Sequence, residues 1–511
     1  MLKSRRFRLL TGVTAGAAAL ALTLTGCQSA VNSAAEASST PVAGGRLTIA
    51  QSSDAQPNNV QSGRLGNFSW AANVFETLTL LDADGDPQPL LAKEWKVADD
   101  GLSIDITLRD DVTFQTGRQM TADDVKYSFE TAAESSSQTS YIAKMFSGIE
   151  VTSPTELTIT FSAPIPNLFD FFEQTFILDQ ETAAGLADGS QVVGTGPFTF
   201  TSWTPGSELK LDRYDGYWGD EPLLDGIDVA VITDSTAMLN AVRSGRSSVA
   251  IGMNPQDVNS IGASSGYTIV NTSGSVYPLG IDVSQAPFDK VEARQALNYA
   301  IDRDRIASQV FGDAATPTDV FWDETSTDYP SDLDDFYSYD PDKAKELLEE
   351  AGATGAAVTI NVISIPANAS VAEIVRNNLE EVGLNPTINA VDTQTFGQNQ
   401  IAGELGQVFM PLHGLNGLAP ITLMNTLPSL RKGNPSKFWT PEYEQLRNDL
   451  LAADEAGYGD ALHALTEYML EQAFSTNVVR VDGQFVQADD AQDLSWSTRA
   501  YLDASKAFVT Q

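Results

Sequence analysis

The sequence of 511 residues predicts an α/β fold, because strand patterns and helix patterns alternate along the chain. Three segments alternate apolar and polar residues with period two, which predicts strands: RLTIAQ (46–51), SIDITL (103–108) and ELTITF (156–161). Helical patterns lie between and after them, and no repeat of solenoid length is present. The interleaving therefore favours an α/β class over an all-helical or all-β one.

The predicted helices have recognisable ends. Asp340 and Pro341 open DPDKAKELLEEAG, which Gly352 closes, and one face of this helix is apolar: Ala344, Leu347, Leu348 and Ala351. Thr121 is expected to cap the helix ADDVKYSFE. Ser370 and Glu373 have the spacing of a capping box, which predicts a helix that starts at Ser370 and ends near Gly383.

The N-terminus has the pattern of a lipoprotein leader. Four basic residues precede an apolar stretch without acids, so we predict a signal peptide over residues 1–26. LTGC resembles the bacterial lipobox, and Cys27 is the single cysteine of the chain, so a disulfide within the chain is excluded. We predict that Cys27 is lipidated and that residues 27–43 form a flexible tether at the extracytoplasmic face of the cell membrane.

The charge of the chain limits its partners. The formal net charge is −38, and removal of the four basic leader residues leaves −42. Nucleic-acid binding requires clustered Lys and Arg, so it is not expected. The acidic residues are interpreted as a solvated surface.

Catalytic motifs are present only as weak matches. The segment 262–266 fits the nucleophile-elbow pattern G-x-S-x-G, but it is expected to follow a helix and precede a strand, the reverse of the elbow. The segment 207–210 fits S-x-x-K on a predicted strand, whereas that motif works from a helix. We therefore predict no catalytic residues, although a glycosidase-type pair among the many carboxylates stays open.

No metal site or cofactor is predicted. His463 and Glu467 are four residues apart on a predicted helix, and two ligands are too few for a stable site. His413 is the only residue for which a metal role stays open, as a ligand to a chelated nickel ion.

Four blocks of the sequence resemble one family. They are residues 74–130, 192–228, 286–312, and 339–352 followed by 370–384, in the order and spacing of the family 5 extracellular solute-binding proteins of ABC importers. The resemblance implies a two-lobed, hinged fold of the periplasmic-binding-protein type (type II) with an extra subdomain in lobe I. It also implies an ABC importer permease as partner and a monomeric receptor. It implies a binding protein and not an enzyme.

The resemblance also implies domain boundaries. Lobe I would comprise residues 44–76, 185–275 and 481–511, with an inserted subdomain over 77–184. Lobe II would comprise residues 276–480. The chain would cross between the lobes near 277–282 and 477–484, and a solute held between the lobes would favour their closure.

Ligand-binding residues are expected after the first strand and in a loop of lobe II. Peptide-binding relatives carry an acid for the peptide ammonium, and Leu418 stands at that position here, with Leu415 at the position of an aromatic. Ser364 stands near the position of a carboxylate-binding arginine. A small, relatively uncharged solute or a peptide is therefore expected, with an extracellular hydrolase or a ligand sensor as the alternatives. The predicted contacts are Asp54, Gln56, Asn58, Ser364, His413, Leu415, Asn416 and Leu418.

Overall fold

The structure is a computed structural model that describes residues 41–82, 85–262, 264–454 and 456–510. The predicted signal peptide, Cys27 and the tether up to residue 40 lie outside the described residues. Residues 41–510 form one compact unit apart from residues 1–40.

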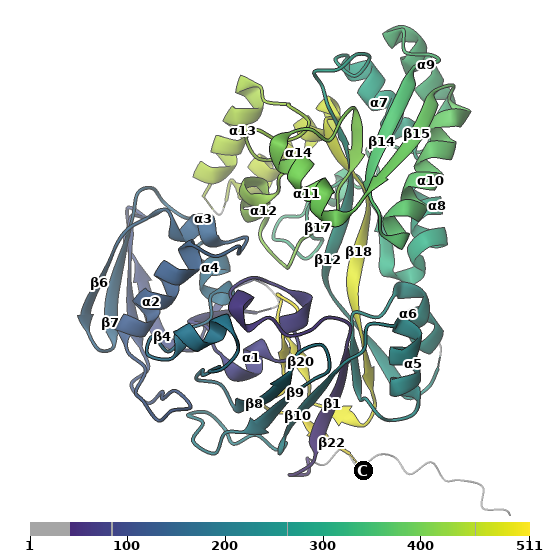
Figure 1. The fold of residues 1–511 in the computed structure, drawn as a ribbon. Helices are drawn as coiled ribbons and strands as arrows, with labels where there is room; N and C mark the ends of the chain where they lie inside the picture. Colours follow the sequence, from purple (N-terminus) through teal and green to yellow (C-terminus); the bar gives the residue numbers. More distant parts are fainter. Residues whose placement is uncertain (1–40, 83–84, 263, 455, 511) are drawn as a thin grey trace, which may run out of the picture. The chain divides into compact units, whose positions relative to one another are not determined.

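One large sheet passes through this unit (Figure 1). Its spatial order is β15 (Asn385–Val391), β14 (Ala357–Ile363), β16 (Val408–Met410), β12 (Tyr267–Ile281), β18 (Ser475–Ala488), β11 (Val249–Ile251), β1 (Arg46–Gln51), β10 (Gly226–Val231), β9 (Glu208–Arg213) and β8 (Phe198–Thr204). Two short strands pair beside the main path, β13 (Ala315–Pro317) with β18 and β17 (His413–Gly414) with β12. The predicted lobe I contains β11, β1, β10, β9 and β8, and the predicted lobe II contains β16, β14 and β15.

A four-stranded antiparallel sheet forms the centre of the predicted inserted subdomain, in the order β4 (Ala92–Val97), β5 (Ser103–Leu108), β7 (Glu156–Phe161) and β6 (Phe146–Ser153). Three small two-stranded sheets complete the β structure: β2 (Thr79–Leu81) with β3 (Pro87–Pro89), β19 (Ala491–Gln492) with β22 (Phe508–Val509), and β20 (Ser495–Trp496) with β21 (Leu502–Asp503).

Helices flank these sheets. The N-terminal half of the chain contains α1 (Ala71–Val74), α2 (Ala122–Ala133), α3 (Ser140–Ala143), α4 (Leu168–Gln174), α5 (Ser235–Arg243) and α6 (Pro255–Gly262). The C-terminal half contains α7 (Val291–Ala300), α8 (Arg303–Ile306), α9 (Pro341–Ala351), α10 (Pro366–Glu381), α11 (Thr393–Ala402), α12 (Pro420–Thr426), α13 (Pro441–Ala452) and α14 (Tyr458–Gln472). The α/β prediction is confirmed.

β12 and β18 connect the two parts of the sheet. They pair antiparallel from Tyr267↔Ala488 to Gly280↔Ser475, and the register shifts between Thr272 and Ser275 and again between Val276 and Pro278. At the first shift the backbones come close, because a Cβ on Gly274 would lie 1.9 Å from the Val481 carbonyl oxygen. Only glycine fits this position.

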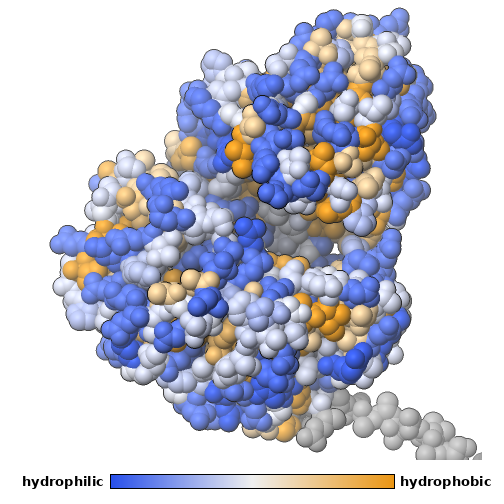
Figure 2. Space-filling model, in the orientation of Figure 1, coloured by the Kyte–Doolittle hydropathy of each residue, from blue (hydrophilic) through white to orange (hydrophobic). Residues whose placement is uncertain are grey.

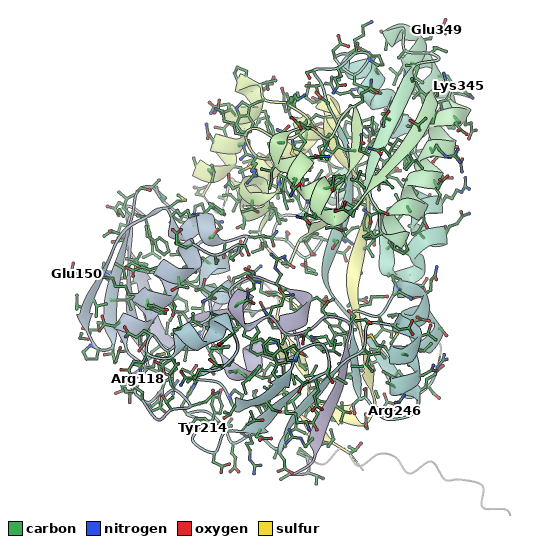
Figure 3. The ribbon with its side chains drawn as sticks, in the orientation of Figure 1. Arg118, Glu150, Tyr214, Arg246, Lys345 and Glu349 are labelled. Atoms are coloured by element: carbon green, nitrogen blue, oxygen red, sulfur yellow. The ribbon has the colours of Figure 1, made fainter. Side chains whose placement is uncertain are left out.

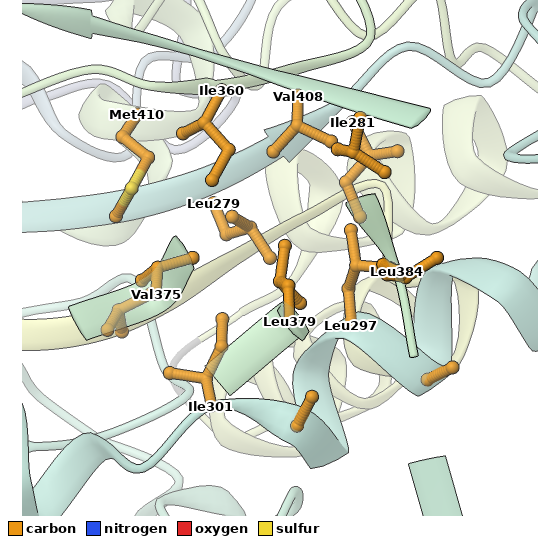
Figure 4. Close-up of a cluster of buried hydrophobic side chains, with 14 of the residues drawn as sticks. Leu279, Ile281, Leu297, Ile301, Ile360, Val375, Leu379, Leu384, Val408 and Met410 are labelled. Carbon is orange, nitrogen blue, oxygen red and sulfur yellow. The ribbon is translucent and has the colours of Figure 1, made fainter. Parts of the chain in front are cut away.

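Separate apolar cores stabilise the parts. One core packs β1, β10 and β11 with the C-terminal segment, and a second lies within residues 78–177, inside the predicted insertion. A third packs β12, β14 and β16 against α7, α9 and α10 (Figure 4). The division into lobes and an inserted subdomain stays a prediction.

Most predicted elements are confirmed. β1, β5 and β7 match the three alternating segments, and the Asp340 side chain caps α9 by accepting a hydrogen bond from the Lys343 N–H at 2.9 Å. The predicted start of this helix at Ser370 was wrong, because α10 begins at Pro366. Ser370 is therefore internal and donates to the Pro366 carbonyl at 3.1 Å instead of capping.

Hydrophilic residues cover much of the face shown in Figure 2. Lys345 and Glu349 of α9, for example, extend from the edge of the molecule in Figure 3. Among the described residues no helix is long and apolar enough to cross a membrane.

We predict that Leu379→Ala lowers the free energy of unfolding by about 2 to 5 kcal/mol, because Leu379 of α10 is completely buried in the third core. Chemical denaturation followed by circular dichroism measures the change. Leu102→Ala is the matched control: Leu102 is 38% exposed, and the change should stay within about 0.5 kcal/mol. Equal losses in the two variants would contradict this account of the core.

Candidate ligand-binding site

A cavity of about 850 Å³ lies where the predicted lobes meet. Its walls come from three parts of the fold: the inserted subdomain with the C-terminal segment, the β12–β18 crossing, and three loops of the predicted lobe II. The first part contributes Phe169, Asp170 and Trp496, and the crossing contributes Asn271, Ser273 and Asp482. The loops contribute Asp323, Glu324, Gly417, Asp454 and Tyr458.

The register shift in β12 positions one corner of the cavity. Ser273 lies in the shifted segment, and its hydroxyl donates to Asp323 Oδ2 at 2.7 Å while it accepts the Gly417 N–H at 2.6 Å. Asp323 Oδ1 also accepts from the Thr325 hydroxyl at 2.8 Å. The crossing strand and two loops of lobe II are thereby connected through one hydroxyl group.

A buried guanidinium lies behind the next part of the wall. Arg480 of β18 has a side chain that is only 2% exposed; its Nη2 lies 2.5 Å from Glu324 Oε2 and its Nε 3.7 Å from Asp482 Oδ1. Burial raises the pKa of Asp482, and the nearby Glu324 and Asp323 raise it further, while Arg480 lowers it. The acidic groups at this position therefore repel one another.

A second buried ion cluster links further parts of the fold around Arg499. Arg499 Nη2 lies 2.7 Å from Asp170 Oδ1, and its Nε lies 2.7 Å from Glu173 Oε2. Asp170 Oδ2 accepts the Ala419 N–H at 3.1 Å and a hydrogen bond from the Thr422 hydroxyl. The inserted subdomain, the C-terminal segment and α12 of lobe II are therefore directly bonded.

Further hydrogen bonds cross between the same parts. The Gln138 amide donates to the Gly414 carbonyl at 3.2 Å, and Gln138 accepts from the Asn416 amide. Asn167 Nδ2 lies 2.5 Å from Thr422 Oγ1. In this conformation the lobes contact each other through polar groups at the border of the cavity.

The predicted contacts after the first strand take local structural roles. Asp54 accepts hydrogen bonds from Trp203 Nε1 at 2.9 Å and from the Gly206 N–H at 2.7 Å. The Gln56 N–H donates to Asn67 Oδ1 at 2.9 Å, and Asn58 is exposed within a 3-10 turn. Ser364 is exposed after β14. These four residues are not among those that line the cavity.

The predicted loop of lobe II lies next to the cavity, with its side chains buried. Leu415 and Leu418 are completely buried in an apolar cluster, and Asn416 bonds Gln138 across the lobes. His413 Nε2 lies 2.8 Å from Ser429 Oγ, and burial lowers the pKa of His413 to about 4. Their neighbours Gly417 and Ala419 line the cavity, and a ligand-binding role for the eight predicted residues stays a prediction.

Six acidic residues of the cavity wall were not predicted from the sequence. Asp82, Asp170, Asp323, Glu324, Asp454 and Asp482 come from segments far apart in the chain. With 68 Asp and Glu residues in the sequence, no local signal distinguishes these six. The polar turn segment DETSTD (323–328) was the one available indication of a functional loop.

A second cavity of about 500 Å³ shares Leu81, Trp496 and Ser497 with the first. It contains Glu76, which accepts from Tyr217 Oη at 2.8 Å and Trp218 Nε1 at 2.7 Å. Burial raises the pKa of Glu76 to about 7, and these hydrogen bonds oppose the shift. In the part of the chain that the structure describes, no group of three or more potential ligands is arranged to hold a metal ion.

The fold defines the class of protein. It matches the NikA protein of Brucella suis in complex with Fe(III)-EDTA with a TM-score of 0.80 and 21% identity, covering 91% of this chain and all of that one. It also matches the oligopeptide-binding protein AppA of Bacillus subtilis in complex with a nonapeptide, with a TM-score of 0.76, 20% identity, and coverage of 92% and 100%. The chain thus has the two-lobed fold of the periplasmic binding proteins.

The sequence defines the family. Residues 86–434 match the model of the bacterial extracellular solute-binding proteins, family 5, and the chain belongs to this family. A curated relative, the dipeptide-binding protein of Escherichia coli (strain K12), is 27% identical over 405 residues, which cover 72% of this chain and 76% of that protein. The chain is therefore a solute-binding protein of the type that serves ABC importers, as the sequence predicted.

The buried His413 generates a prediction about pH. Its folded-state pKa of about 4 lies below the usual 6.5, so the unfolded chain binds this proton more readily between these values. The stabilisation from neutral His413 is present above pH 6.5 and is lost as the pH falls toward 4, by roughly 3 kcal/mol. Denaturation of wild type and His413→Gln at pH 7 and pH 4 should show the smaller acid loss in the variant.

Ser429→Ala is the control for this prediction. It removes the hydrogen-bond partner of His413 but keeps the ring buried, so its acid loss should remain close to that of the wild type. If His413→Gln and the wild type lose the same stability, burial of the histidine does not contribute to acid sensitivity.

Proposed function

We propose that this chain captures a peptide or another small organic solute in the cavity of about 850 Å³ and presents it to an ABC importer permease. The observation that supports this most is the composition of the cavity wall, which both lobes and the crossing strands build together. A solute that touches both lobes stabilises their contact by its differential affinity for the closed arrangement. The permease would then distinguish the loaded receptor from the empty one.

The leader supports a membrane-anchored receptor. The lipobox-like LTGC would place a lipid on Cys27, and the segment up to residue 43 would leave the folded unit free to reach the permease. The receptor would act as a monomer at the extracytoplasmic face, with no bound cofactor.

The contacts of the histidines favour this function over hydrolysis. His413 and Ser429 form the one His–Ser hydrogen bond recorded among the described residues, and Ser429 is completely buried. A substrate could not reach this hydroxyl without unfolding its surroundings. His463, which lies on α14, instead has its Nε2 2.9 Å from Asp332 Oδ2. A ligand sensor would use the same cavity, and the genes next to this one would separate transport from signalling.

We predict that Cys27→Ala abolishes lipidation and releases the protein from membranes, because the thiol is the acceptor of the lipid. Metabolic labelling with a fatty acid, followed by membrane fractionation, measures both effects. Ser29→Ala is the control and should keep label and membrane association. Undiminished label on Cys27→Ala would show that the anchor lies elsewhere.

Solute capture should appear as thermal stabilisation. In a screen of peptides, amino sugars, oligosaccharides and metal chelates, a true ligand at about 100 times its Kd adds about 2.7 kcal/mol of stability. Ala453→Trp, which fills part of the cavity, should remove this shift. Val97→Trp adds the same side chain at an exposed position of β4 outside the cavity and should keep it. A shift that survives Ala453→Trp would place the ligand elsewhere.

A further inference from the structure

We propose that the solute is an organic cation with two or more ammonium or guanidinium groups, as in a basic oligopeptide or a free polyamine. This inference rests on the proposed function, because the cavity between the lobes is taken as the solute site. The family membership and the shared walls define the site, and the charge of those walls specifies the class of solute.

The cavity wall carries one sign of charge. Six of the described residues that line it are acidic, and no Lys, Arg or His is among the described lining residues. A cleft lined by one sign of charge between low-dielectric walls concentrates the electrostatic potential and attracts the opposite charge. The acids also come from different segments, Asp82 and Asp170 from the inserted subdomain, Asp482 from β18, and Asp323, Glu324 and Asp454 from lobe II. A single cation would not meet all of these segments.

The two buried guanidinium groups near the wall do not neutralise it. Arg480 contacts Glu324 and Asp482, and Arg499 is divided between Asp170 and Glu173. Both arginine side chains are at most 2% exposed and lie behind the acids. The two guanidinium groups thus contact four carboxylates, three of which line the cavity, and neither arginine lies on the cavity wall.

The environment of Asp323 supports a cationic solute most strongly. Asp323 is 5% exposed and lines the cavity, yet it forms no ion pair with any basic side chain of the described residues. Its partners are the hydroxyls of Ser273 and Thr325 and the Thr325 N–H. A buried charge without a counter-charge is costly, and a cation in the cavity would supply the missing charge. The raised pKa of Asp482 has the same physical origin, since burial and neighbouring acids both destabilise its charged form.

The rest of the wall also suits an organic cation. Phe169, Tyr458 and Trp496 contribute aromatic rings, which attract ammonium and guanidinium groups. The volume of about 850 Å³ lies in the range of small-molecule sites, so the cavity is large enough for a solute with several functional groups. Carboxylates for the charges and rings for the aliphatic stems together recognise a flexible polycation better than a hydrated metal ion.

Calorimetric titration of the full-length protein in detergent tests the proposal with four probes. Tri-lysine and spermidine are the cationic probes, tri-alanine is the probe without net charge, and tri-glutamate is the anionic probe. We expect binding by at least one cationic probe, at least a hundredfold weaker binding by tri-glutamate, and weakening of the cationic complex as salt increases. A preference for tri-lysine over spermidine identifies the source as peptides, and the reverse identifies polyamines.

Neutralising variants locate the charges. Asp482→Asn and Asp454→Asn should each weaken the cationic probe about tenfold, the scale of one charge-assisted hydrogen bond. Asp454 is exposed, so Asp454→Asn is expected to fold even if Asp482→Asn, on the crossing strand β18, does not. Asp342→Asn on α9, whose side chain is 96% exposed and lies outside the cavity, is the matched control and should bind as the wild type does.

The outcomes separate this inference from the proposed function. Tri-alanine or tri-glutamate binding as tightly as the cationic probes, or an unaltered affinity in both wall variants, overturns the cationic class and leaves solute capture intact. The same holds if neither cationic probe binds while another member of the wider thermal-shift screen does. If neither cationic probe nor any member of that screen binds, both the inference and the proposed function are overturned.

Discussion

Two strands, β12 and β18, carry the backbone between the lobes, and their antiparallel ladder occupies the middle of the large sheet. A regular antiparallel ladder would bond the backbone groups of every second residue of β12 to β18 without interruption. The shift between Thr272 and Ser275 interrupts it, and the close approach of Gly274 to Val481 makes this interruption compact. The result is that Ser273 can bond the two loops of lobe II that bear Asp323 and Gly417. One irregularity in one strand pair therefore fixes the corner of the cavity.

The charged groups near the crossing form a second level of organisation. Arg480 and Arg499 are both buried, and each contacts two carboxylates. Such partners offset the desolvation of a buried guanidinium, which would cost several kcal/mol for an unpaired charge. These arginines contact Asp482, Glu324 and Asp170 on the wall, while Asp323 forms no ion pair with a basic side chain of the described residues. The same ion clusters thus stabilise the fold and give the cavity its potential.

The fold was largely predictable because its signals are local. The period-two alternation of β1, β5 and β7 and the Asp–Pro start of α9 are present in short segments, and the structure has these elements at the expected residues. The start of α10 was missed because two local signals compete: the capping-box spacing of Ser370 and Glu373, and the preference of Pro366 for the first helical turn. Proline fixed the start, and Ser370 was left inside the helix.

The candidate site was not predictable in the same way. The loop around Leu418 predicted a solute without strong charge, because it lacks the acid that peptide-binding relatives carry at this position. Leu418 is completely buried in an apolar cluster, so an acid there would have to be desolvated before it could meet a ligand. Electrostatic potential in a cavity depends on the distances of all charges from its centre and not on their order in the chain. Carboxylates from the inserted subdomain, from β18 and from two loops of lobe II therefore act together, and the absence of an acid at one loop position does not make the site neutral.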